Sequence, residues 1–371
     1  MTTPDFGRRF RFVGLLTVAA VYLLILVGGV VRSTGSGMGC PDWPKCFGTW
    51  IPPTQASELP ANYKEIYTAQ RVAKNQKLAR TLERLGFKQV AGNIFAHPSQ
   101  YIETDFNPVK TWIEYVNRLL GALIGVLIFA AVAAARPYWR RDRPVFWLAL
   151  TALLLTGVQG WLGSLVVSTN LLPVMVTVHM GLALLIVALL LYAVDRARRG
   201  GVGAGPPTEA APIETGFQLG LWLALGLTFT QIVLGTQVRE QVDMVSAAAG
   251  YLGRETWVSK LGGVFKVHRS VSVLVLVLNA YLSYELWQLG PARLRRLALA
   301  TLSLVGLEMV AGITLASWAL PAAVQPVHLT LAVLLFGAQF LTLLAVSTNP
   351  YPPGSLQRPD APATSAQRVV A

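Results

Sequence analysis

The chain contains only four histidines, and three of them, His179, His268 and His328, lie within long apolar stretches. Ionisable side chains are costly inside a membrane and are functional there by default, although a lone histidine on an apolar helix is often only a buried, hydrogen-bonded residue. Two histidines on facing helices of a bundle can hold heme iron between them. We therefore interpret His268 and His328 as the two axial ligands of a heme.

Zinc fits this pair less well, because it needs three or four ligands and no acid, cysteine or second histidine lies close by in the sequence. The fourth histidine, His97, lies in a polar stretch next to Pro98 and is expected to be a surface residue.

A carboxylate distinguishes the region around His179. Glu114 and Asn117 are three residues apart and so share a helix face, which predicts that both side chains enter one cavity. At the equivalent place in the other half of the chain the residue is Phe265 rather than an acid. One half then has two strong ligands and no acid, while the other has His179 and a carboxylate. This asymmetry predicts electron transfer in the first case and chemistry in the second. The alternative is that Glu114 is an interfacial acid paired with Arg118.

Other polar residues lie at the ends or centres of the apolar stretches. Four arginines are expected at one level, where they could bind heme propionates or act as membrane-interface anchors: Arg32, Arg118, Arg239 and Arg269. Glu308 lies in the middle of an apolar stretch, which indicates a role in proton transfer or structural hydrogen bonding that the sequence does not assign.

Two cysteines, Cys40 and Cys46, are separated by five residues in a long polar segment. A disulfide bridge is the favoured interpretation, a redox-active pair is the alternative, and metal binding is the least favoured. Residues 63–90 of the same segment combine Lys and Arg with Leu, Ile and Val at helical spacing, which predicts an amphipathic helix over the outer face, acting as a lid.

These residues must be positioned by membrane helices. Hydrophobic residues make up 53% of the 371 residues and charged residues 13%, against about 25% in an average soluble chain. This excludes a soluble enzyme, a disordered chain and a disulfide-rich secreted domain. Runs of about 20 apolar residues span a membrane. Breaks at Asn170, Pro173 and Pro321 give eight predicted spans, at 12–31, 112–135, 144–167, 173–194, 215–238, 264–284 and two within 297–346.

Arginines are concentrated in the short connections of one side, which places both termini in the cytoplasm by the positive-inside rule. The segment 32–111 is too long for that rule and is placed outside. The net charge of +13 is thus a signal of topology, and no nucleic acid is expected. The chain runs directly into its first span with no cleavage site, which favours a bacterial inner membrane, with the heme sites toward the outer side.

The two halves repeat one pattern. A glycine three residues before an arginine ends the first and fifth spans, and Gly163 and Gly312 each lie sixteen residues before a histidine. We therefore predict an all-α membrane protein built from two duplicated four-helix bundles. The expected segments are a cytoplasmic N-terminus at 1–11, a first bundle at 12–194, a cytoplasmic linker at 195–214, a second bundle at 215–346 and a disordered tail at 347–371.

The sequence resembles the heme A synthase family over about residues 12–346. The resemblance rests on the following stretches: Gly28-Gly29-Val30-Val31-Arg32-Ser33-Thr34-Gly35-Ser36-Gly37 continuing into Cys40-Pro41-Asp42-Trp43-Pro44-Lys45-Cys46, Glu114-Tyr115-Val116-Asn117-Arg118, Gln159-Gly160-Trp161-Leu162-Gly163 upstream of His179, His268-Arg269, and His328.

The resemblance implies an enzyme that oxidises the ring methyl of heme O to the formyl of heme A by successive hydroxylations. It implies heme b bound by His268 and His328, and heme O bound in the first half beside Glu114 and His179. Cys40 and Cys46 match loop cysteines of many members. Asn117 departs from the family, because many members have His there.

Two other functions stay open: a diheme b-type electron-transfer cytochrome, against which Glu114 argues, and a non-catalytic heme carrier or oxidase assembly factor. No flavin, iron–sulfur or nucleotide fingerprint is present, so we expect an unidentified electron donor. Besides heme O and membrane lipid, the sequence leaves a heme O synthase and a second copy of the chain open as partners.

Overall fold

The computed structural model describes residues 4–96, 102–169, 171–199, 215–289 and 291–348. His97 and Asn170 lie outside these ranges, as do most of the expected linker and tail. Within them the protein is helical, and its one β feature is an isolated bridge between Cys46 and Thr49. Eight of the described helices are long and apolar enough to cross a membrane. They are α1 (Pro4–Ser33), α4 (Pro108–Ala135), α6 (Arg143–Ser168), α7 (Pro173–Arg198), α8 (Thr215–Ala248), α9 (Gly263–Leu289), α10 (Ala292–Ser317) and α11 (Val324–Thr348).

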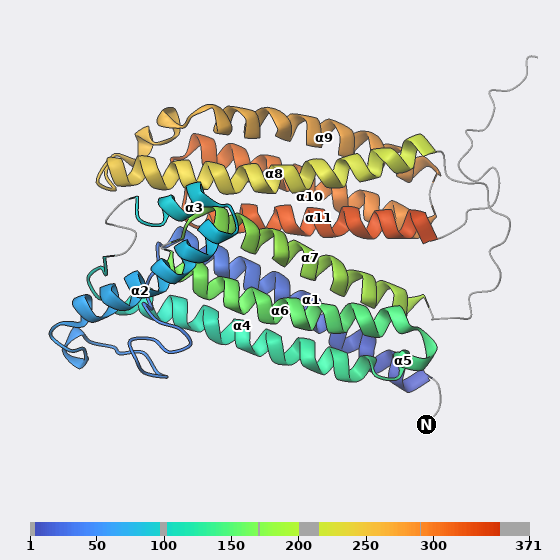
Figure 1. Cartoon of the computed structure of the whole chain (residues 1–371). Coiled ribbons are helices and arrows are strands. Elements are labelled where there is room, and N and C mark those ends of the chain that lie inside the picture. Colours follow the sequence, from blue (N-terminus) through green and yellow to red (C-terminus); the bar gives the residue numbers. More distant parts are fainter. Residues whose placement is uncertain (1–3, 97–101, 170, 200–214, 290, 349–371) are drawn as a thin grey trace, which may run out of the picture.

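The eight helices form two groups with their long axes side by side (Figure 1). In the first, α1 packs on α4, α4 on α6 and α6 on α7; in the second, α8 packs on α9, α9 on α10 and α10 on α11. The expected class, an all-helical multi-pass membrane protein with eight spans, is therefore confirmed. The internal duplication and the cytoplasmic placement of the termini stay predictions.

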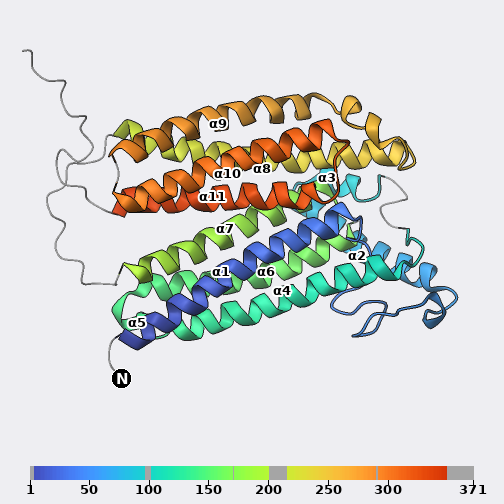
Figure 2. The ribbon, with the colours of Figure 1, turned by 180° about the vertical axis from the view of Figure 1, so that it is seen from behind.

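The two groups meet along α11, which packs against both α1 and α7 (Figure 2). Glycines allow this close approach. A Cβ atom added to Gly29 on α1 would lie 2.8 Å from Cβ of Pro326 on α11. A Cβ atom added to Gly337 on α11 would overlap the hydroxyl of Tyr22 on α1. The interface between the groups is thus held at a helix separation that only glycine allows at these positions.

Two helices extend furthest beyond their predicted apolar runs. The α1 helix begins at Pro4 rather than residue 12, and α8 continues past residue 238 to Ala248. Hydropathy reports only the part of a helix that lies in hydrocarbon, so charged end turns escape it. The extension of α8 matters because it carries Asp243 to the rim of the cavity described below.

The polar segment between α1 and α4 lies at the end opposite the N-terminus of α1 (Figure 1). It contains a 3₁₀ turn (Ala56–Glu58), α2 (Tyr63–Arg84) and α3 (Lys88–Asn93). The predicted helix at 63–90 is thus two helices, separated at Gly86, whose φ of 89° suits glycine. The buried face of α2 is Tyr67, Arg71 and Asn75, so it is largely polar rather than apolar.

Three short elements complete the described chain: α5 (Tyr138–Arg141) and the 3₁₀ turns Arg254–Thr256 and Val258–Lys260.

A buried ion pair fixes the outer segment. Arg71 Nη2 lies 2.6 Å from Glu103 Oε2, and the two side chains are 2% and 3% exposed. Burial raises the pKa of Glu103, and the Arg71 guanidinium opposes that rise. Removing one partner of a buried pair leaves an uncompensated charge, which makes this contact far more important than an exposed pair.

The contact of Gly337 with Tyr22 gives a stability prediction. Gly337→Ala overpacks the interface between the two groups and should cost about 1–3 kcal/mol, seen as a lower Tm in detergent. Adding Tyr22→Phe removes the clashing hydroxyl and should restore most of the loss. Gly181→Ala, which has open space around its Cβ, is the matched control and should not lower Tm. An equal loss in the single and the double variant would contradict this account.

The buried ion pair gives a pH prediction. In Arg71→Leu, Glu103 loses the cation that opposes the rise of its pKa, so folding favours its protonated form. The outer segment should lose about 3–5 kcal/mol at pH 8, and less at pH 5, where the acid can take up a proton. Hydrogen exchange of α2 amides measures this opening. Lys64→Leu breaks the exposed pair with Asp105 and should change exchange little at either pH. A pH-independent loss in Arg71→Leu would refute the assignment.

Candidate functional site

A single cavity of about 1400 Å³ lies among the helices of both groups. This exceeds the ~300–1,000 Å³ of ordinary small-molecule pockets, so it can take a very large ligand or two ligands. Its lining includes the polar positions singled out from the sequence on the eight helices: Arg32, Glu114, Asn117, Arg118, His179, Arg239, His268, Arg269, Glu308 and His328.

His268 on α9 and His328 on α11 lie next to each other in this cavity, with ring centroids 6.4 Å apart and planes at 81°. Two metal–imidazole bonds of about 2.0–2.1 Å span most of such a gap, and the inner halves of the rings account for the rest. Within the described chain, Nδ1 of His268 has no hydrogen-bond partner. These observations fit two axial ligands of one heme iron.

Glycines on the neighbouring helices provide a seat for each of these side chains. A Cβ atom added to Gly235 or to Gly312 would lie 3.6 Å from Cε1 of His268 or His328, respectively. In the other half, Gly163 stands in the same relation to His179 at 3.7 Å. Because any larger residue would reach the imidazole, glycine at these positions lets each ring lie against the adjacent helix.

The fourth such position pairs Gly28 with Asn117, whose Oδ1 would lie 4.0 Å from an added Cβ. Asn117 thus occupies the place that histidine occupies three times elsewhere. Its Oδ1 is buried without a hydrogen-bond partner among the residues described, and so is Nδ1 of His179. The first half therefore presents one imidazole and one weak oxygen donor where the second presents two imidazoles.

Two glutamines hold the backbone at the histidines. Nε2 of Gln159 donates to the carbonyl oxygen of His179 at 2.9 Å, and Nε2 of Gln231 donates to that of His268 at 2.7 Å. Glu308 differs, because its Oε2 lies 3.0 Å from the ring atom Nδ1 of His328.

Glu114 faces the disulfide loop as well as the cavity. The predicted Cys40–Cys46 disulfide is present. Oε2 of Glu114 accepts the backbone N–H of Cys40 at 2.9 Å, and Oε1 accepts from Arg118. The pairing of Glu114 with Arg118, which the sequence left as an alternative, is therefore formed, and it leaves the carboxylate 4% exposed.

Arg118 holds the loop from the same helix. Besides Glu114, its guanidinium donates to the carbonyl oxygens of Cys40, Asp42 and Lys45 at 3.0, 2.6 and 3.1 Å. These four bonds use all the N–H groups of Nη1 and Nη2, so only Nε–H remains for a propionate. Among the described residues, Trp43, Pro44 and Trp50 of this loop line the cavity, and none of α2 does. The loop, rather than the expected lid helix, covers this end.

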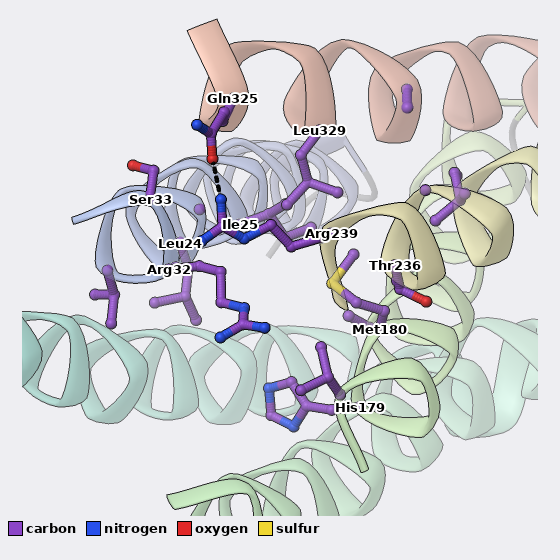
Figure 3. A pocket seen from close by; sticks show the side chains of 18 of the residues that line it. Leu24, Ile25, Arg32, Ser33, His179, Met180, Thr236, Arg239, Gln325 and Leu329 are labelled. Atoms are coloured by element: carbon purple, nitrogen blue, oxygen red, sulfur yellow. Dashed lines mark hydrogen bonds between the residues drawn. The ribbon is translucent and has the colours of Figure 1, made fainter. Parts of the chain in front are cut away.

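At the rim of the cavity, charged side chains of the two halves bind each other. Arg32 on α1 and Arg239 on α8 both bind Asp243, and Arg239 Nη1 also donates to Oε1 of Gln325 at 2.6 Å. Figure 3 shows Arg32 near the imidazole of His179, with Arg239 directed at Gln325. A second link lies deeper, where the hydroxyls of Thr177 and Thr236 are 2.8 Å apart.

Sequence reasoning missed Asp243, Gln231 and the seating role of the four glycines. Asp243 lies beyond an apolar run, and no local signal shows that α8 continues to it. The glutamines had a usable signal: Gln159 and Gln231 each lie four residues before a seating glycine.

Comparison with known proteins identifies relatives of this chain. Relatives named heme A synthase include one of Shewanella oneidensis, 26% identical over 66% of this chain and 62% of its own length, and one of Bradyrhizobium sp. (strain ORS 278), 24% identical over 75% and 74%. A third, from Granulibacter bethesdensis, is 25% identical over 87% of this chain and 83% of its own. A family model described as cytochrome oxidase assembly protein matches residues 11–91 and 87–340. Because that match covers most of the chain, the protein belongs to the COX15-CtaA family of cytochrome oxidase assembly proteins.

Proposed function

We propose that the protein is a heme A synthase, an oxidoreductase that converts the ring methyl of heme O to the formyl of heme A by two successive hydroxylations, after which the gem-diol loses water. The observation that carries this is one cavity with two unequal sites: His268 and His328 as a bis-imidazole pair, and His179 with Asn117 and a carboxylate as the other. A protein that only transferred electrons would have no need of a site with one imidazole, Asn117 and a carboxylate.

In the second half, His268 and His328 would hold heme b, which supplies one-electron redox chemistry when bound. Gly235 and Gly312 give the rings room, and Gln231 fixes the backbone that carries His268. The chain's contribution here is to hold both rings in a fixed orientation in an apolar environment.

In the first half, His179 would bind the iron of the substrate heme O, and Asn117 would leave the opposite face without a strong ligand. Glu114 is positioned at the edge of this site by Arg118 and by the N–H of Cys40. A carboxylate so held can orient a reacting hydroxyl or accept its proton only where a ligand displaces part of this network.

Arginines at the rim would bind propionates. Arg32 and Arg239 both bind the carboxylate of Asp243, and Glu240 lies within electrostatic reach of Arg32 on the same side of the cavity. Arg269 lines the cavity from α9 as well. Charge-assisted bonds to propionates would orient the porphyrin edge and leave the opposite edge in the apolar part.

The proposed setting follows from topology. We place the termini in the cytoplasm and both sites toward the outer side of a bacterial inner membrane, with electrons exchanged with a partner protein. Arg196, Arg199 and Arg293, which bind Asp142 and Asp195, gather at the end carrying α5, as the positive-inside rule requires of the cytoplasmic side.

Pigment extraction tests the proposed activity. The purified protein, expressed where heme O is available, should yield heme b together with heme O and heme A. His179→Ala should keep heme b and form no heme A, because only the first site loses its imidazole. Extraction of heme b alone, reducible by quinol, would indicate an electron-transfer cytochrome instead. Heme O bound but never converted would indicate a carrier.

The substitution Asn117→His tests the coordination of the substrate site. Since Asn117 has the position against Gly28 that the three histidines have against their glycines, an imidazole there should reach the same iron as His179. The first-site heme should change from high spin to low spin in optical and EPR spectra. Asn117→Gln, which adds length but no imidazole, is the control and should leave it high spin. Spectra that show only the second-site heme in all three proteins would overturn this assignment.

A further inference from the structure

Glu308 is an acid in the cavity wall that the proposed activity does not use. It lies in the middle of α10, its side chain is 15% exposed, and its Oε1 has no hydrogen-bond partner within the described chain. A carboxylate at this depth is expensive unless a specific partner compensates it. The nearest basic group is the imidazole of His328, at 3.0 Å from Oε2.

The chemistry of this position differs from its counterparts. Gln159 and Gln231 use their amide N–H to donate to a histidine carbonyl. An ionised carboxylate has no hydrogen to donate and can only accept. Glu308 lies four residues before Gly312, as the glutamines lie four residues before their glycines. Its carboxylate therefore contacts the ring atom Nδ1 of His328 instead of a backbone carbonyl.

The two atoms are within hydrogen-bond range, but Nδ1 of His328 has no hydrogen bond of good geometry among the described residues. A rotation of the imidazole about its Cβ–Cγ bond would be needed to direct an Nδ1–H at Oε2. The Nδ1–H tautomer that this contact selects leaves Nε2 of His328 as the atom that is free to bind iron.

We propose that Glu308 is a positioning residue that fixes the tautomer of His328 and lowers the reduction potential of the heme in the second half; this rests on the proposed heme site at His268 and His328. A carboxylate that accepts the Nδ1–H of a metal-bound histidine makes the imidazole more basic. A more basic ligand stabilises the ferric over the ferrous iron.

The two axial ligands are then unequal. In the part of the chain that is described, Nδ1 of His268 has no hydrogen-bond partner, whereas Nδ1 of His328 lies 3.0 Å from Oε2 of Glu308. The effect on the reduction potential is thus assigned to the ligand His328 on α11. The side chain that produces it is Glu308 on α10.

A redox titration of the purified protein tests this. The His179→Ala background removes the ligand of the first site, so that the second-half heme gives the optical signal. Glu308→Gln keeps the shape and an acceptor but removes the charge; Glu308→Leu removes both. The midpoint should rise in the order wild type, Gln, Leu. At a fixed ambient potential, the ratio of oxidised to reduced heme in Glu308→Leu should fall by about tenfold.

Glu240→Gln is the control for the loss of any cavity carboxylate, because Glu240 lines the cavity from α8 without contacting a histidine. It should shift the midpoint much less than Glu308→Gln does. An unchanged midpoint in Glu308→Gln and Glu308→Leu, with the low-spin bis-imidazole spectrum intact, would overturn the inference while leaving the proposed heme site standing. Absence of that spectrum in the His179→Ala parent would overturn the proposed heme site, and the inference with it.

Discussion

The whole site depends on how closely pairs of helices approach at four glycines. Gly28, Gly163, Gly235 and Gly312 leave the space into which one asparagine and three imidazoles fold against a neighbouring helix. A Cβ atom added at any of these positions would already touch the imidazole or the amide, so a longer side chain would compete with it for the same place. The glycines therefore let these polar side chains pack directly against the neighbouring helices while they line the cavity, and the ligand chemistry depends on which residue lies opposite each glycine.

The sequence predicted the eight helices, the disulfide and a shared cavity for Glu114 and Asn117, but not that polar side chains of both halves line one cavity. These features depend on local properties: run length, residue spacing and the cost of placing ionisable groups in lipid. The histidine positions were informative because the chain has only four, and three of them recur at matching places.

What the sequence could not show is how the polar groups pair. Glu114 accepts from the N–H of Cys40, 74 residues away, and Arg32 binds Asp243 across the two halves. Such partners depend on where loops return in space, which hydropathy and spacing do not encode. The bounds of α1 and α8 were underestimated for a related reason, since their charged end turns carry no apolar signal.

The contact between Arg32 and Asp243 joins residues 211 positions apart in the chain. All contacts among α1, α4, α6 and α7 can form while the second half is still being synthesised, whereas this one requires α8 to be in place. Local contacts generally form before distant ones, because closing a long loop costs more entropy. By the same reasoning the contacts of α1 with α11, such as Gly29 against Pro326, form later still, and until then the N-terminal half offers its site from an open edge.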